Sequence, residues 1–259
     1  GFKTVLQRLE GNALIQKSIF ENQQSISKKE KYYTITKIED LKKLVQEIKK
    51  HGICAIDTET DSLDLNNVNL VGISLSLNEN QAYYIPITHK ELLMNKLCKD
   101  QIKLDDVIKQ ISILCEDPAI LKIGQNIKYD LRVLQKYNIK INSIADTMLM
   151  SYAFENGITR HNMDALAFKH LNHITTKFKD VVGSGKKAIT FDYVNIKEAT
   201  SYAAEDALIT FKLFNIFTQT LVSKSNNFVY EKIDKPLINV LVSMENRGIK
   251  VDKKFLENL

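Results

Sequence analysis

With 259 residues, 44% of them hydrophobic, the chain can bury one large core, and its net charge of +5 permits a polyanionic partner without requiring one. Three scattered cysteines without a Cys-x-x-Cys pair argue against disulfides and structural zinc and favour a reducing compartment, the cytoplasm. No apolar run approaches a membrane span and no signal peptide opens the chain, so we expect no membrane partner. Because the first residue is Gly1, we expect a piece of a longer polypeptide.

The elements expected first along the chain are strands. Residues 1–30 are polar and are expected to be a lead-in segment without chemistry of its own. A β-prone run at 32–35 precedes an amphipathic helix, for which Thr36 and Glu39 form an expected capping box. Apolar runs separated by polar turns then predict an antiparallel meander of strands at 53–60, 69–77 and 82–87.

The following segment alternates helices with a strand. Helical periodicity is present at 104–114, 128–137, 146–155 and 163–171, and a short apolar strand is expected at 119–123. A further helix is expected after Asn195, which can cap it. This order fits an α/β fold of the ribonuclease H-like type, with a mixed five-stranded sheet and helices on both faces, although composition alone does not separate it from other α/β folds.

Two acids at the end of the strand at 53–60 are the first candidates for chemistry. Asp57 and Glu59 are one residue apart, so both side chains point to the same side of the strand. Carboxylates held together repel each other, and a hard divalent cation such as Mg²⁺ relieves that repulsion. From this pair alone, two solvated acids are an equally good explanation.

Two later stretches can complete an acid cluster. Asp130 lies in the first turn of a helix just beyond a strand, where ligands gather in open α/β sheets, although the helix dipole alone could explain it. Tyr202 and Asp206 are four residues apart on one helix face, above small residues. A buried Tyr–Asp packing pair is the alternative there. Glu205 is one position round the helix and is expected to be solvated.

These stretches carry a specific resemblance. The motifs are Asp57-x-Glu59, Asn126-x-Lys128-x-Asp130 and Tyr202-x-x-x-Asp206. Their order and spacing resemble the three motifs of the DEDD exonuclease superfamily, in its tyrosine branch. Longer matching strings at 57–63, 124–130, 160–164 and 202–206 resemble the proofreading domain of the bacterial DNA polymerase I family, over about residues 31–259.

The resemblance implies a 3′→5′ exonuclease that removes nucleoside 5′-monophosphates from a DNA 3′ end. It implies two divalent metal ions, Mg²⁺ or Mn²⁺, and metal ligands at Asp57, Glu59, Asp130 and Asp206. Asp57 would bridge both ions, and Tyr202 with Glu59 would orient the attacking water. A phenol is a poor base at neutral pH, so orientation suits Tyr202 better than proton abstraction.

The resemblance also implies how single-stranded or frayed DNA is held. It places Leu63 and Phe178 against the terminal bases, and considered alone these two would be ordinary loop or core residues. The residues that it places near the DNA end or its phosphates are Gln125, Asn126, Lys128, Tyr129 and Arg160.

The chain after residue 222 resembles the entry into a polymerase domain. We expect an exonuclease domain at 31–222 and a truncated start of a polymerase domain at 223–259, with a helix between Pro236 and Gly248. The expected partners are the DNA 3′ end and the remaining polymerase domain, and the expected state is a monomer without polymerase activity. Two alternatives stay open: a catalytically weak or inactive module that binds single-stranded DNA, and a ribonuclease D-like RNA 3′ exonuclease.

Overall fold

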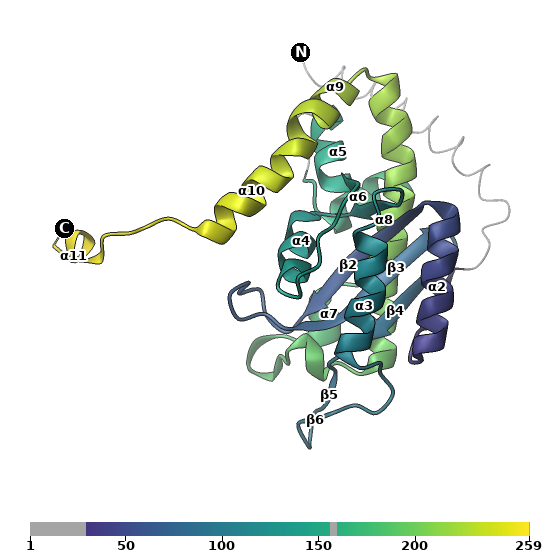
Figure 1. Cartoon of the computed structure of the whole chain (residues 1–259), viewed down its shortest axis with the longest axis vertical. Coiled ribbons are helices and arrows are strands. Elements are labelled where there is room, and N and C mark those ends of the chain that lie inside the picture. The colour runs from purple at the N-terminus through teal and green to yellow at the C-terminus, as the bar shows by residue number, and fades with distance from the viewer. Residues whose placement is uncertain (1–29, 156–159, 259) are drawn as a thin grey trace, which may run out of the picture. The chain divides into compact units, whose positions relative to one another are not determined.

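A six-stranded mixed sheet lies at the centre of the fold (Figure 1). The computed structural model of the chain describes residues 30–155 and 160–258, so the expected lead-in lies outside the described residues apart from Glu30. The strand order is β1-β4-β3-β2-β7-β8. The bounds are β1 (Lys31–Thr34), β2 (Ile53–Thr60), β3 (Leu70–Asn78), β4 (Gln81–Pro86), β7 (Leu121–Gly124) and β8 (Ile144–Asp146).

The pairing confirms the expected meander. Strand β3 pairs antiparallel with both β2 and β4, whereas β1 pairs parallel with β4, and β7 pairs parallel with both β2 and β8. The sheet has six strands, so the expected number of five is wrong. The missed strand is β8, whose first two residues were assigned to no element and whose last residue, Asp146, was expected to begin a helix. Its three residues are too few to show a period of their own, and pairing with β7 defines it.

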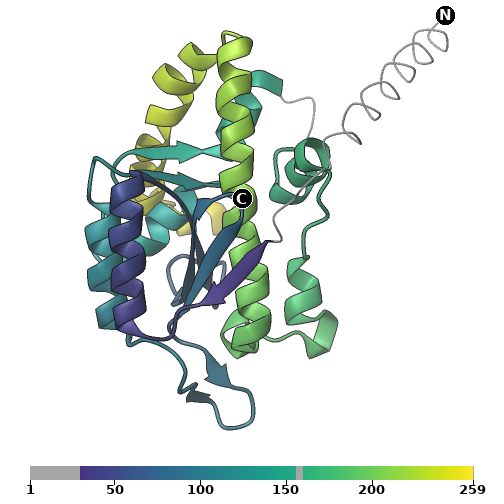
Figure 2. The same cartoon turned by 90° about the vertical axis from the view of Figure 1, so that its right-hand side faces the viewer.

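Helices cover both faces of the sheet, as expected. Figure 2 shows the purple α2 (Ile38–His51) on one face and the long green α8 (Ile196–Ser223) on the other. On the sheet face that α2 covers, α3 (Leu104–Cys115) and α4 (Lys128–Gln135) also contribute to the main apolar core. The other helical elements are α5 (Thr147–Glu155), α6 (Met163–Leu171), α7 (Phe178–Val182), η1 (Gly185–Lys187), η2 (Phe191–Tyr193), α9 (Asn227–Val229), η3 (Tyr230–Asp234), α10 (Lys235–Arg247) and α11 (Lys253–Glu257); a small hairpin pairs β5 (Lys90–Glu91) with β6 (Lys96–Leu97).

The helix caps were predicted with mixed success. Asn195 caps α8, since its side chain accepts a hydrogen bond of 2.9 Å from the Lys197 N–H. The capping box at Thr36 is wrong. The backbone N–H groups of Asp40 and Leu41 bond to the carbonyl of Lys37, so α2 begins one residue later and Lys37 occupies the cap position without a side-chain bond.

A buried polar contact fixes the start of α8 against the sheet. The Tyr84 hydroxyl lies 2.8 Å from His89 Nε2, and His89 Nδ1 lies 3.0 Å from the carbonyl of Val194, just before the α8 cap. Tyr84 crosses directly over Gly72, where an added Cβ would lie 2.0 Å from the hydroxyl oxygen. The sequence therefore needs glycine at this position of β3, because it leaves room for the Tyr84 side chain that bonds to His89.

The helix expected near the end of the chain is present as α10. Only a narrow stripe of its surface packs against the main core. Ile238 and Val242 are buried in the main core. The other apolar residues Leu237, Val240 and Met244 are exposed. Within the described residues, no helix combines the length and the apolar character needed to cross a membrane.

Candidate active site

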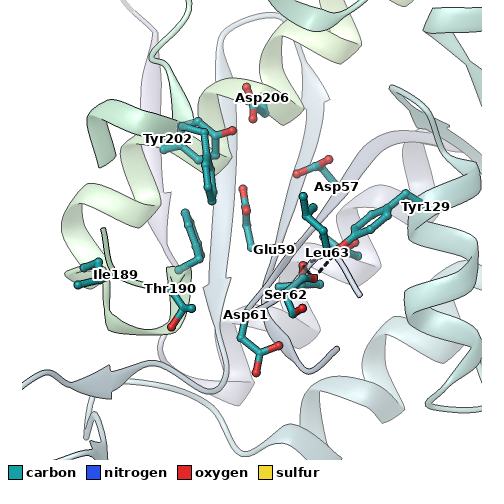
Figure 3. Close-up of a pocket in the computed structure, with 14 residues that line it drawn as sticks. Asp57, Glu59, Asp61, Ser62, Leu63, Tyr129, Ile189, Thr190, Tyr202 and Asp206 are labelled. Atoms are coloured by element: carbon teal, nitrogen blue, oxygen red, sulfur yellow. Dashed lines mark hydrogen bonds between the residues drawn. The ribbon is translucent and has the colours of Figure 1, made fainter. Parts of the chain in front are cut away.

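Three acids from two elements meet at one place above the sheet (Figure 3). Asp57 and Glu59 lie near the end of β2, and Asp206 faces them from α8. One carboxylate oxygen from each residue lies within 4.8 Å of the other two. Because side chains on a strand alternate, the one-residue spacing places both β2 acids on the side that α8 covers.

The fourth acid, Asp130, lies beside this group in the first turn of α4. It is 2% exposed, and its Oδ1 accepts hydrogen bonds from the Thr58 N–H (2.9 Å) and from the Thr58 hydroxyl (2.6 Å). Thr58 is the residue between Asp57 and Glu59. The two bonds therefore hold α4 against the acid-bearing end of β2.

The acids share an unfavourable environment. Burial raises the pKa of Asp57 to about 7. The pKa values of Glu59, Asp130 and Asp206 are also raised, first by burial and then by the negative charge of Asp57. Oxygen ligands that repel one another are the donor set that hard divalent cations prefer, so these residues fit such an ion.

Tyr202 lies one helical turn before Asp206, and Figure 3 shows both side chains at the same side of the cleft. Its ring contacts Phe178 and Phe191, with centroid distances of 6.0 and 5.9 Å. Ala203 on α8 is fully buried in the same cluster, which lets the helix approach the sheet. Burial raises the pKa of Tyr202, so the phenol keeps its proton at neutral pH and acts as a donor.

The acids form the floor of a cleft of about 370 Å³. Figure 3 shows Leu63 and Tyr129 on one side of the acids and Ile189 and Thr190 on the other. Leu63 is 88% exposed and Phe178 is 49% exposed, although both line this cleft. Acids below exposed apolar side chains form a site where a metal-bound phosphate and a flat apolar group can bind together.

Comparison with known proteins decides the family. A family model described as 3′-5′ exonuclease matches residues 32–222. The chain belongs to the 3′–5′ exonuclease family. It is 40% identical over 241 residues to DNA polymerase I of Rhizobium leguminosarum, covering 88% of this chain and 24% of that protein. It is 38% identical over 216 residues to DNA polymerase I of Pseudomonas aeruginosa, covering 82% and 23%.

Solved structures show the same fold for this exonuclease. The M. smegmatis Pol1 domain in complex with DNA primer-template and dNTP has a TM-score of 0.66 at 15% identity, covering 87% of this chain and 34% of that one. Brucella melitensis NrnC has a TM-score of 0.61 at 20% identity, covering 86% and 95%. The ribonuclease H-like α/β architecture is thereby confirmed. The chain spans about a quarter of the length of the DNA polymerase I relatives.

One predicted DNA-contact residue of the exonuclease also shapes the cleft wall. The Tyr129 hydroxyl lies 2.6 Å from Thr60 Oγ1 and donates to the carbonyl of Ser62 at 3.2 Å. Asp61 accepts two bonds from Asn69, from its N–H (2.8 Å) and from its side-chain amide (2.7 Å). These contacts hold the loop that presents Leu63.

Four other predicted DNA-contact residues are not among those that line the cleft. Gln125 donates to the carbonyl of His161 at 2.8 Å and also pairs with Thr147. Lys128 is paired with Glu245 of α10. Asn126 and Arg160 are exposed. Two of the four thus have partners within the chain.

Sequence reasoning missed one residue that shapes the second motif. Asp146, at the end of β8, is 1% exposed and accepts bonds from the N–H groups of Ile127 (2.8 Å) and Asn126 (3.3 Å). Asn126 has φ of +63°, a left-handed conformation that the two bonds support. The signal was available, because Ile144 and Ala145 run into an acid just as the apolar residues before Asp57 do.

One expectation about α8 is wrong. Glu205 is 7% exposed instead of solvated. Its carboxylate bonds to His173 and to the backbone of Thr176. The helical period places Glu205 beside Asp206, but only the path of the segment at 172–177 decides what covers it.

Proposed function

We propose that the chain is the proofreading exonuclease domain of a DNA polymerase I and hydrolyses the terminal phosphodiester of a DNA 3′ end, which releases a nucleoside 5′-monophosphate. The observation that carries this proposal is the group of acids Asp57, Glu59 and Asp206 below the exposed side chains of Leu63 and Phe178; Glu59 is buried, and the two aspartates are half-buried. The acids suit a metal-bound phosphodiester, and the apolar side chains suit the bases beside it.

The proposed cofactors are two divalent ions, Mg²⁺ or Mn²⁺. Asp57, Glu59 and Asp206 would hold one ion, with Asp57 shared between both, and Asp130 would hold the second by way of water. When bound, the ions lower the pKa of the attacking water and stabilise charge on the leaving 3′-oxygen. Asp130 cannot swing freely toward an ion, because Thr58 fixes its Oδ1 with two hydrogen bonds. This restraint suits a ligand that acts through water.

The protein side chains would position the water. Tyr202 keeps its proton, so its hydroxyl can donate to one lone pair of the water while Glu59 accepts from it. Edge-on and tilted contacts with the rings of Phe178 and Phe191 hold the Tyr202 ring in place. Orientation of a nucleophile in this way lowers the entropic part of the barrier.

The cleft would take a single-stranded or frayed 3′ end. Leu63 and Phe178 would contact the terminal bases without reading their identity, and Tyr129 would support the Leu63 loop. Asn126 and Arg160 would contact the DNA from the rim. Gln125 and Lys128 would first have to exchange their partners within the chain for phosphate. With a net charge of +5, binding should be weak and should decrease with salt.

We propose the domain organisation on the same basis. Residues 1–30 would be a lead-in, 31–222 the exonuclease domain, and 223–259 the start of a polymerase domain whose remaining part is the natural partner. A monomer without polymerase activity is the proposed state. The three unpaired cysteines support the cytoplasm as the compartment.

The test is hydrolysis of a 5′-labelled, 3′-tailed DNA oligonucleotide with Mg²⁺ or Mn²⁺, beside a chelator control. We expect a ladder that shortens from the 3′ end and disappears with chelator or with Asp57→Ala. Glu198→Ala is the matched control, since Glu198 is an exposed acid on α8. A folded protein without a ladder would refute the proposal, and faster degradation of an RNA of the same sequence would favour the ribonuclease D-like alternative.

A further inference from the structure

A buried carboxylate on α8 holds the segment that carries Phe178. Glu205 Oε1 lies 2.8 Å from His173 Nε2, and Glu205 Oε2 accepts a bond of 2.7 Å from the Thr176 N–H. Both oxygens are therefore used on a segment without regular secondary structure, 172–177. A buried carboxylate with one partner missing is costly, so the bonds hold the segment firmly.

A third bond, to a different helix, fixes the same segment. Thr175 is 6% exposed, and its hydroxyl donates to Asp164 on α6 at 2.6 Å. Two acids from two helices thus hold three polar groups of this segment, on His173, Thr175 and Thr176, shortly before α7. The first residue of α7 is Phe178, two residues after Thr176.

Phe178 has a fixed place beside the catalytic groups as a result. Its ring stacks on Phe191 with an interplanar angle of 13° and meets the Tyr202 ring edge-on. Half of the side chain remains exposed in the cleft. Glu205 directly precedes Asp206 in the chain. One turn of α8 therefore carries both an acid of the cleft floor, Asp206, and the residue that holds the segment before Phe178, Glu205.

We propose that Glu205 is a positioning residue that holds Phe178 at the distance from Asp206 at which it stacks on the terminal base of a single-stranded DNA 3′ end. This inference rests on the proposed function and deepens it. Glu205 itself would touch neither DNA nor metal. It acts through His173 and Thr176, and its loss would weaken binding of the terminal base while leaving hydrolysis of bound DNA nearly unchanged.

The experiment measures affinity and activity with two single-stranded decamers. One ends in a normal nucleotide and the other in an abasic nucleotide at the 3′ end. Anisotropy of a 5′ fluorophore in the presence of chelator gives Kd without hydrolysis, and steady-state kinetics with Mg²⁺ give KM and kcat. Glu205→Ala should raise Kd and KM for the normal decamer about five- to tenfold, with kcat within about twofold, because a base–aromatic stack is worth about 1–3 kcal/mol.

Two comparisons separate positioning from general damage. With the abasic decamer, Glu205→Ala and the wild type should bind alike, since no base is left to stack. In a Phe178→Ala background, Glu205→Ala should have no further effect, because the ring that Glu205 positions is already absent. Glu198→Ala is the matched control and should behave as the wild type.

Additive effects of the two substitutions, equal weakening for both decamers, or unchanged Kd would overturn the inference. If Glu205→Ala fails to fold, His173→Ala removes one of the two bonds from a partly exposed side chain, and the same pattern is then required of it. Absence of hydrolysis by the wild type would refute the proposed function. The binding comparison in chelator would still test the role of Glu205.

Discussion

The floor of the cleft consists of acids on long regular elements, whereas its walls carry apolar side chains on short connecting segments. In the floor, Asp57 and Asp206 lie close enough for mutual repulsion, and burial raises the pKa of each. In the walls, Leu63 and Phe178 are exposed. In the floor, carboxyl groups are partly removed from solvent, and in the walls, apolar side chains are exposed to solvent. Both arrangements oppose folding stability locally, and both suit a charged ligand with flat apolar groups.

The largest effect should come from removing one floor acid. We expect Asp57→Asn to lower kcat/KM by at least about a thousandfold, because this acid would be shared by both metal ions. The same change should raise the thermal midpoint without metal, since it removes a buried like charge. Activity assays and thermal unfolding in chelator measure both effects. An active Asp57→Asn, or one less stable than the wild type, would contradict this account of the floor.

A smaller loss is expected where floor and wall meet. Tyr202→Phe keeps the ring that contacts Phe178 and removes only the hydroxyl. We expect kcat to decrease about 10- to 100-fold while KM changes little, because water orientation is lost and stacking is kept. Steady-state kinetics on single-stranded DNA provide the test. A change confined to KM would assign Tyr202 to the wall instead.

The floor should also make the metal-free protein sensitive to pH. The pKa of Asp57 is raised to about 7 from an ordinary value of 3.8, so the folded state binds a proton more tightly than the unfolded state. The free energy of unfolding should therefore increase as pH falls from 8.5 to 6.5. Asp57 alone contributes about 1 kcal/mol, or about 3 °C in thermal midpoint.

Two histidines oppose this trend in part. Burial lowers the pKa of His89 to about 4 and also lowers the pKa of His170, so each begins to destabilise the folded protein as pH approaches the ordinary value of 6.5. Their contribution is the same in the wild type and in Asp57→Asn, so the difference between the two proteins isolates Asp57. The measurement is thermal unfolding in chelator at constant ionic strength, for the wild type and Asp57→Asn. The slope should be reduced in the variant, and an equal slope in both proteins would exclude Asp57 as its source.

The smallest effect should come from the exposed wall. Leu63→Ala should raise KM about three- to tenfold, because most of one apolar contact with a base is lost. The thermal midpoint should stay within about 1 °C of the wild type, since Leu63 is 88% exposed and has little burial to lose. Kinetics and thermal unfolding of one preparation measure both, and a marked loss of stability would show that the loop contributes to the core.

Local patterns predicted the floor better than the contacts that hold the walls. The apolar run before Asp57 and the helical spacing of Tyr202 and Asp206 lie within a few residues, so their periods identify strand and helix. The partners of Glu205 are 29 and 32 residues away, and no local pattern reports them. The three-residue strand β8 is likewise defined by its pairing with β7, although the apolar pair before Asp146 gave a local signal for that acid.

The high exposure of Leu63 has a consequence for how such domains diverge. A side chain that contributes little to folding can be exchanged by mutation without a stability penalty, whereas a Cβ added at Gly72 would collide with the buried Tyr84 side chain. Natural variation in the preferred nucleic-acid end should therefore accumulate at the loop after Thr60, and the β3 position opposite Glu59 should stay unchanged. Positions that can vary without loss of stability, such as Leu63, are thus separate from positions that packing fixes, such as Gly72.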